Sequence, residues 1–211
     1  EYLGKQEGDI FPEDVADIST ITFVGDDGFI NTPFVNVTTM SVRDPNAIFN
    51  VDTGASRINQ GTNPSTITTL ADFAHFANLE ELALYDMSFS KLEGIGELTK
   101  NQKLHSFHLS FDSNLTTLEG IGKLTQLTKL RLVGLPVTDL SELEKLTALT
   151  VLETSDVLMD NIAYMQKLEN LEMLFAYQVP VLEWQKSLDA LNVKTYEVQM
   201  VDGTTLEHLA Q

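Results

Sequence analysis

Apolar residues recur along the chain in one pattern, apolar-x-x-apolar-x-apolar, and this pattern returns at nearly constant intervals. Its central positions are Leu82, Phe107, Leu130, Leu152, Leu174 and Tyr196, which are separated by 25, 23, 22, 22 and 22 residues. Alternating apolar positions indicate a short strand, and the three-residue spacing that follows indicates a turn and a helical or 3₁₀ return. The pattern therefore predicts six regular repeats over residues 79–211.

Two of the returning segments are nearly identical, which indicates that the units are true repeats. Residues 92–98 read Leu-Glu-Gly-Ile-Gly-Glu-Leu, and residues 118–124 read Leu-Glu-Gly-Ile-Gly-Lys-Leu. One such unit cannot bury its apolar side alone, so stacked units must share one continuous core. We expect an α/β solenoid that is curved, with a parallel sheet on its concave face and short helical or 3₁₀ returns on its convex face.

Over most of the chain these repeats resemble the leucine-rich-repeat proteins of the bacterial internalin type. The resemblance implies a leucine-rich-repeat solenoid in a secreted or cell-surface binding protein. It also implies that residues 1–17 form a short N-terminal cap. One position departs from the family pattern, because the Asn that usually stands five residues after the central apolar residue is replaced. The residues found there are Met87, Asp112, Leu135, Val157, Val179 and Val201.

The repeats before residue 79 are less regular. Strand spacing is present at residues 18–23 and 37–42, but the interval from Met40 to Leu82 is 42 residues, about one unit too long. We therefore expect one domain over residues 1–211, with irregular repeats at 18–78 and an insertion at about 43–66. The insertion is interpreted as a small hairpin, with a hidden extra repeat as the alternative. Gly203, Leu206 and Leu209 keep the period to the end, so we expect the native protein to continue or a partner to cover this end.

The composition fits a folded protein and disfavours two classes of partner. Hydrophobic residues make up 43% of the 211 residues and charged residues 21%, and there is no cysteine. The net charge is -18, from 31 acidic residues against 13 Lys and Arg. Phosphate backbones are bound by clustered Lys and Arg, so nucleic acid and anionic membrane surfaces are poor candidates. No apolar stretch approaches the roughly 18 residues that a membrane span needs.

The candidate catalytic and metal motifs are weak. Residues 51–56 (Val-Asp-Thr-Gly-Ala-Ser) resemble the active-site turn of retroviral-type aspartic proteases, but that chemistry needs two such carboxylates and the chain has one. The histidines are scattered, which disfavours a metal site, and the oxygen-bearing residues at 44–52 match no standard calcium loop. The sequence therefore predicts no catalytic residues, no metal ligands and no cofactor.

The alternation within each strand predicts which side chains point away from the core. If Leu82 and Leu84 point inward, their neighbours Glu81, Ala83 and Tyr85 point outward on the sheet. The same register in later repeats gives a strip with charged residues in the middle and aromatic residues at the ends, and aromatic residues with Met or Arg are typical of interfaces. The predicted partner-binding residues are Tyr85, His108, Phe111, Lys129, Arg131, Glu153, Met173, Phe175 and Tyr177.

These observations favour a noncatalytic module that binds a protein or glycan through its concave sheet face. The secreted or cell-surface location follows from the family resemblance alone. Two alternatives remain: an intracellular repeat scaffold or regulatory subunit, and the repeat subdomain of a larger surface enzyme. The strip also has an alternative to an interface: its side chains pack against one another, or the strand register slips by one residue.

Overall fold

The computed structural model describes residues 17–24, 27–30, 67–159, 162–180, 184–191 and 193–208. Several sequence-based expectations fall outside these ranges. They are the N-terminal cap apart from Asp17, the strand around Met40, the insertion at 43–66 and the Val-Asp-Thr-Gly-Ala-Ser segment. The division of the chain into cap, irregular repeats and regular repeats stays a prediction.

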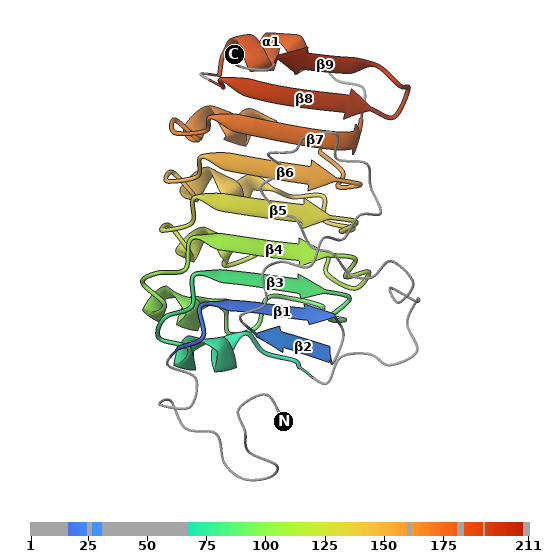
Figure 1. The fold of residues 1–211 in the computed structure, drawn as a ribbon. Coiled ribbons are helices and arrows are strands. Elements are labelled where there is room, and N and C mark those ends of the chain that lie inside the picture. Colours follow the sequence, from blue (N-terminus) through green and yellow to red (C-terminus); the bar gives the residue numbers. More distant parts are fainter. Residues whose placement is uncertain are drawn as a thin grey trace.

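The described residues form one nine-stranded sheet in which neighbouring repeats lie side by side (Figure 1). Its order is β2-β1-β3-β4-β5-β6-β7-β8-β9. The strands are β1 (Thr20–Val24), β2 (Asp27–Ile30), β3 (Glu81–Tyr85), β4 (Ser106–Ser110), β5 (Lys129–Val133), β6 (Val151–Ser155), β7 (Met173–Val179), β8 (Thr195–Met200) and β9 (Thr205–His208). Strands β1 and β3 to β8 pair in parallel, while β2 and β9 pair antiparallel at the two ends.

Short helices return the chain from the end of one strand to the start of the next. They are η2 (Ala71–His75), η3 (Ile95–Lys100), η4 (Ile121–Lys123), η5 (Ser141–Lys145), η6 (Ala163–Lys167) and α1 (Trp184–Asp189), and all but α1 are 3₁₀ helices. A 3₁₀ helix brings residues three apart onto one line, which suits the three-residue apolar spacing. Leu140, Leu143 and Leu146 are accordingly all buried in the repeat that contains η5.

The core lies between one face of the sheet and the short helices. Leu82 and Leu84 from β3 and Leu130 and Leu132 from β5 belong to one hydrophobic cluster that runs through the stacked repeats. Trp184 is fully buried in this cluster. Parallel strands in the predicted register, short returns and a shared core confirm the leucine-rich-repeat solenoid predicted from the sequence.

The chain leaves β3 to β6 through a residue with left-handed backbone geometry, and Gln178 near the end of β7 has the same geometry. The residues are Asp86, Phe111, Gly134, Asp156 and Gln178, with φ between 51° and 61°. The amide of Phe111 donates to the carbonyl of Val133, at 2.8 Å, and the other members of the column from Asp86 to Asp156 make the same bond to the following repeat. The hydrogen-bond ladder therefore extends one residue past the strands.

The position where the family usually carries Asn is filled by buried apolar residues, by Asp112 and, after β8, by the exposed Val201. Met87, Leu135, Val157 and Val179 are buried in the core and supply apolar contacts. Asp112 instead accepts hydrogen bonds from backbone amides: Phe89 N lies 2.6 Å from its Oδ2, and the amide of Asn114 is a second donor. Burial raises the pKa of Asp112, and these backbone donors oppose the rise.

The two ends of the sheet differ from the sequence-based expectation. The period predicts that the repeat continues through Leu206, but this residue lies in β9, opposite Val198 of the antiparallel partner β8. Gly203 adopts φ 88° in the connecting turn, and the amide of Met200 donates to the carbonyl of Thr204. A hairpin therefore covers the edge of β8. At the other end β1 pairs directly with β3 and, on its other edge, with β2.

Candidate functional site

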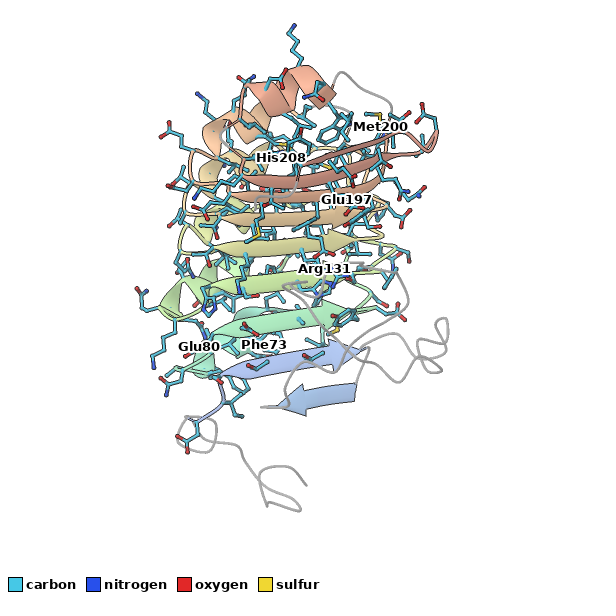
Figure 2. The ribbon with its side chains drawn as sticks, turned by 45° about the horizontal axis from the view of Figure 1, so that its top comes forward. Phe73, Glu80, Arg131, Glu197, Met200 and His208 are labelled. Carbon is cyan, nitrogen blue, oxygen red and sulfur yellow. The ribbon has the colours of Figure 1, made fainter. Side chains whose placement is uncertain are left out.

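The predicted partner-binding residues lie mainly on the face of the sheet opposite the core, which we call the outer sheet face. His108, Arg131, Glu153 and Phe175 occupy one row across β4, β5, β6 and β7, each opposite the next in the strand register. Arg131 is marked on β5 in Figure 2. Buried side chains of this face, such as Phe175, are not members of the core cluster, so the predicted strand register is correct.

The predicted strip is less accessible than its outward direction suggests. Tyr85, His108, Glu153 and Phe175 are buried, with exposed fractions between 2% and 8%. The alternation of the strand gives the direction of a side chain, but it does not give the packing around that side chain. The expectation of a continuous accessible strip therefore needs correction.

A hydrogen-bonded chain runs through the first strands of this face. The Tyr85 hydroxyl and His108 Nδ1 are 2.8 Å apart, and the two rings meet edge to face at a centroid distance of 4.5 Å. His108 Nε2 is hydrogen-bonded to the hydroxyl of Ser110. Burial, and then the positive charge of Arg131, hold the pKa of His108 well below its ordinary value. The imidazole is therefore neutral at pH 7, and both neighbouring hydroxyls can match whichever tautomer it adopts.

An ion pair continues the row on the next two strands. Arg131 Nε lies 3.0 Å from Glu153 Oε1, and both side chains are largely buried. Burial raises the pKa of Glu153, while the Arg131 guanidinium opposes that rise. A buried ion pair contributes little net stability but fixes the position of both groups, because separating them leaves an uncompensated charge.

The remaining predicted residues are more accessible. Lys129, Met173 and Tyr177 are half-buried on the same face, the first on β5 and the other two on β7. Phe111 is 38% exposed and does not lie on the face itself, because it follows the last residue of β4. The structure therefore brings together Tyr85 with His108 and Arg131 with Glu153, and it leaves Phe111 at the edge of the sheet.

Three residues of interest were not singled out from the sequence. Ser110 completes the hydrogen-bonded chain with His108, and its outward register position was the available signal. Leu158 and Val201 are exposed at 48% and 62%, in the turns after β6 and β8. Leu158 stands between the buried residues Val157 and Met159, so the alternation around it was a usable signal.

The hydrogen-bonded chain does not have the form of a nucleophilic catalytic site. A serine hydrolase places a carboxylate behind the histidine and leaves the serine open to substrate. Here a phenol stands behind His108, and Ser110 is buried. Within the described ranges, no group of three or more His, Cys, Asp or Glu residues is placed to hold a metal ion. No helix in the described part of the chain is long and apolar enough to cross a membrane.

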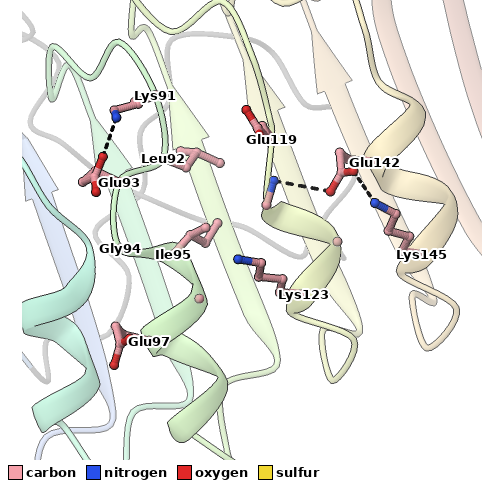
Figure 3. Close-up of a pocket in the computed structure, with 13 residues that line it drawn as sticks. Lys91, Leu92, Glu93, Gly94, Ile95, Glu97, Glu119, Lys123, Glu142 and Lys145 are labelled. Carbon is pink, nitrogen blue, oxygen red and sulfur yellow. Dashed lines mark hydrogen bonds and ion pairs between the residues drawn. The ribbon is translucent and has the colours of Figure 1, made fainter.

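A pocket of about 590 Å³ lies on the opposite side of the solenoid, between the turns that lead into η3, η4 and η5 (Figure 3). Several of its charged groups are bound to neighbours on the same surface. Lys91 Nζ lies 2.7 Å from Glu93 Oε2, and Glu142 accepts from both Lys145 and the amide of Gly120. The hydrogen bond between Gly120 and Glu142 joins neighbouring repeats. Both ion pairs lie within one repeat, on an exposed surface where such pairs contribute little stability.

Solved structures similar to this chain include two internalins from Listeria monocytogenes. The internalin inlF is 21% identical, with 66% of this chain and 47% of that chain covered and a TM-score of 0.45. Internalin C2 is 20% identical, with 64% of this chain and 76% of that chain covered and a TM-score of 0.36. A leucine-rich-repeat protein from Leptospira interrogans is 22% identical, with 65% and 36% covered and a TM-score of 0.44.

These are the kinds of protein that the sequence resembles, and at such identities the likeness concerns the fold alone. The chain spans less than half the length of inlF and of the Leptospira protein. No protein-family model matches the chain. No curated protein matches it either.

Proposed function

We propose that this chain is a noncatalytic recognition module that binds a protein or glycan through its outer sheet face. The proposal includes export to the surface or exterior of a bacterial cell, as the internalin resemblance implies. The observation that carries it is the set of half-buried side chains Lys129, Met173 and Tyr177 on this face. They lie beside the fixed and largely buried row of His108, Arg131, Glu153 and Phe175. The row combines fixed polar groups with aromatic area on rigid elements.

The chemistry of this row suits recognition because its parts are held before a ligand arrives. The hydrogen bond to Tyr85 fixes His108, and the ion pair fixes Arg131 and Glu153. Fixed side chains lose little conformational entropy on binding, which raises the affinity that a given contact area supplies. Tyr177 and Met173 contribute accessible apolar area, and Tyr and Met are enriched at interfaces.

The test is a binding screen with purified chain against host-surface proteins, glycans and cell-wall fragments. The parent is compared with Lys129→Ala/Met173→Ala/Tyr177→Ala, which removes the half-buried groups and leaves the buried network intact. A matched control, Lys123→Ala/Lys167→Ala, changes lysines that belong to the 3₁₀ helices η4 and η6. Circular dichroism and thermal unfolding establish that all three proteins are folded.

We expect a ligand that binds the parent and the lysine control equally but binds the outer-face variant at least about tenfold more weakly, because interface anchors carry most of the binding energy. A ligand that binds the folded outer-face variant as well as the parent would move the site elsewhere on the chain. If the parent binds nothing in the screen, the recognition role itself is refuted in favour of a scaffold role within a larger protein.

A further inference from the structure

All three large apolar side chains that the described residues expose lie along one edge of the sheet. Phe111, Leu158 and Val201 follow β4, β6 and β8, whose arrowheads point to the same edge (Figure 1). We call the described turns after β3 to β8 the strand-end rim; it comprises residues 86–90, 111–117, 134–138, 156–159, 180 and 201–204. Adjacent strands lie about 4.8 Å apart, so the three residues are spread over roughly 20 Å along this edge. Scattered apolar residues are ordinary on a surface, but three confined to one edge are not scattered.

The strand-end rim also has a charge of one sign. Its described residues include four aspartates, Asp86, Asp112, Asp156 and Asp202, and neither Lys nor Arg. Asp112 is buried and accepts from the backbone amide of Phe89. Asp156 and Asp202 are exposed, although Asp156 accepts from the Ser155 hydroxyl and Asp202 from the amide of Thr204, and Asp86 is half-buried. Lys91, directly after the first range of the rim, is paired with Glu93, and other lysines lie in η3 to η6 and in β5. The rim is therefore an acidic edge with apolar side chains between the carboxylates.

Phe111 occupies its place at the cost of backbone strain. Its φ is 58°, a left-handed value that bulky residues disfavour, while the equivalent positions carry Asp86, Gly134, Asp156 and Gln178. Its ring lies over Gly134, where an added Cβ would stand 2.8 Å from the ring carbon Cδ1. An aromatic residue is a poor choice for this backbone position, so its presence there is an outlier that points to a role for the exposed ring.

We propose that the strand-end rim is a docking surface for a basic polypeptide segment of a partner protein. Phe111, Leu158 and Val201 would anchor apolar side chains of the segment, and Asp86, Asp156 and Asp202 would pair with its Lys or Arg residues. Phe111 also offers a ring face to a cation. An extended segment of six or seven residues spans roughly 20 Å and reaches all three anchors. This surface is separate from the outer sheet face and does not depend on the function proposed for that face.

The test begins with a displayed library of random 12-residue peptides, selected on the chain of residues 1–211 at low salt. Selected peptides are then synthesised and titrated against the parent and three variants. The anchor variant is Phe111→Asn/Leu158→Ser/Val201→Ser, the charge variant is Asp86→Asn/Asp156→Asn/Asp202→Asn, and Lys123→Ala/Lys167→Ala is the matched control. Asn tolerates left-handed geometry, so the anchor variant keeps the turn, and the charge variant keeps the anchors.

We expect selected peptides to carry Lys or Arg beside apolar residues, with affinity for the parent that falls as salt rises. Both rim variants should bind at least tenfold more weakly, with the charge variant losing most of the salt dependence, and the control should match the parent. The proposal is overturned by peptides without a basic excess, by rim variants that bind as tightly as the parent, or by a library without binders. Sedimentation showing that the chain self-associates through Phe111 would also overturn it, because the occupant would be a second copy. The peptides are also titrated against Lys129→Ala/Met173→Ala/Tyr177→Ala, and loss of binding in that variant alone would overturn the proposal in favour of the outer sheet face.

Discussion

Among the described glycines, Gly94 has the least room for an added side chain, so Gly94→Ala gives a sharp test of the repeat packing. Its φ is 76°, and an added Cβ would lie 2.5 Å from Thr69 Oγ1 and 2.6 Å from the backbone nitrogen of Ala71. These atoms cannot move aside freely, because Leu70 N donates to the carbonyl of Glu93 at 2.7 Å and Ala71 N donates to Thr69 Oγ1. Left-handed geometry costs Ala about 1 kcal/mol and overpacking about 1–3 kcal/mol, which gives about 2–4 kcal/mol in total.

Two other glycines separate the steric cost from the backbone cost. Gly203 has φ 88° with no atom within 4 Å of an added Cβ, so Gly203→Ala should cost only about 1 kcal/mol. Gly96 does not have positive φ, and its added Cβ would meet only the Lys123 side chain, at 3.4 Å or more, so Gly96→Ala should be within about 0.5 kcal/mol of the parent. Urea unfolding measures all three differences. Equal losses at Gly94 and Gly203 would refute the close approach between the first two returns.

Three further predictions concern the buried polar groups. Because the pKa of His108 is lowered in the folded state, the unfolded chain binds a proton on this residue that the folded chain does not, so the free energy of unfolding falls as the pH drops below 6.5, by up to about 1.4 kcal/mol per pH unit. Thermal unfolding of His108→Gln and of the parent from pH 7.5 to 5.5 should show that the variant lacks this loss. The same pH dependence of stability in both proteins would contradict the prediction. Arg131→Met and Glu153→Leu should each lower the free energy of unfolding by about 3–5 kcal/mol, whereas the double variant should lose less than either single variant. Urea unfolding of all four proteins gives this double-mutant cycle, and additive losses would refute the interaction between the two residues. Asp112→Ala should lower the free energy of unfolding by about 1–3 kcal/mol, because the amide of Phe89 loses its acceptor. Asp112→Asn keeps an acceptor and should be at least as stable as the parent at pH 7. Similar losses of stability in both variants, measured by chemical denaturation, would count against Asp112 as the acceptor for this amide.

The repeat and its register were predictable because both follow from spacing alone. The register pairs residues such as Leu130 and Leu152, which the sequence separates by 22 positions. Arg131 and Glu153 are separated by the same 22 positions, so the register already places them side by side, although their ion pair was not among the sequence-based predictions. A solenoid converts sequence period directly into neighbours in space, which makes such cross-repeat pairs the most predictable contacts of the fold.

Features that depend on local packing were not predictable from the period. Burial of Tyr85 and Glu153 depends on what surrounds the outer side chains, and alternation carries no information about that. Phe111 in left-handed geometry runs against the backbone preference of its residue type, so only the structure reveals it. Leu206 has the spacing of another return, but a turn at Gly203 directs it into β9.

The most direct test of the central claim, that the outer sheet face contacts a ligand, is oxidative footprinting of the chain with and without a ligand from the binding screen. Met173 and Tyr177 are half-buried in the free chain and have oxidisable side chains. Phe76 and Tyr196, which are also half-buried but pack against the core, serve as internal references. The account predicts that a saturating ligand slows oxidation of Met173 and Tyr177 and leaves the references unchanged. Unchanged oxidation of Met173 and Tyr177 in the presence of a bound ligand would contradict it.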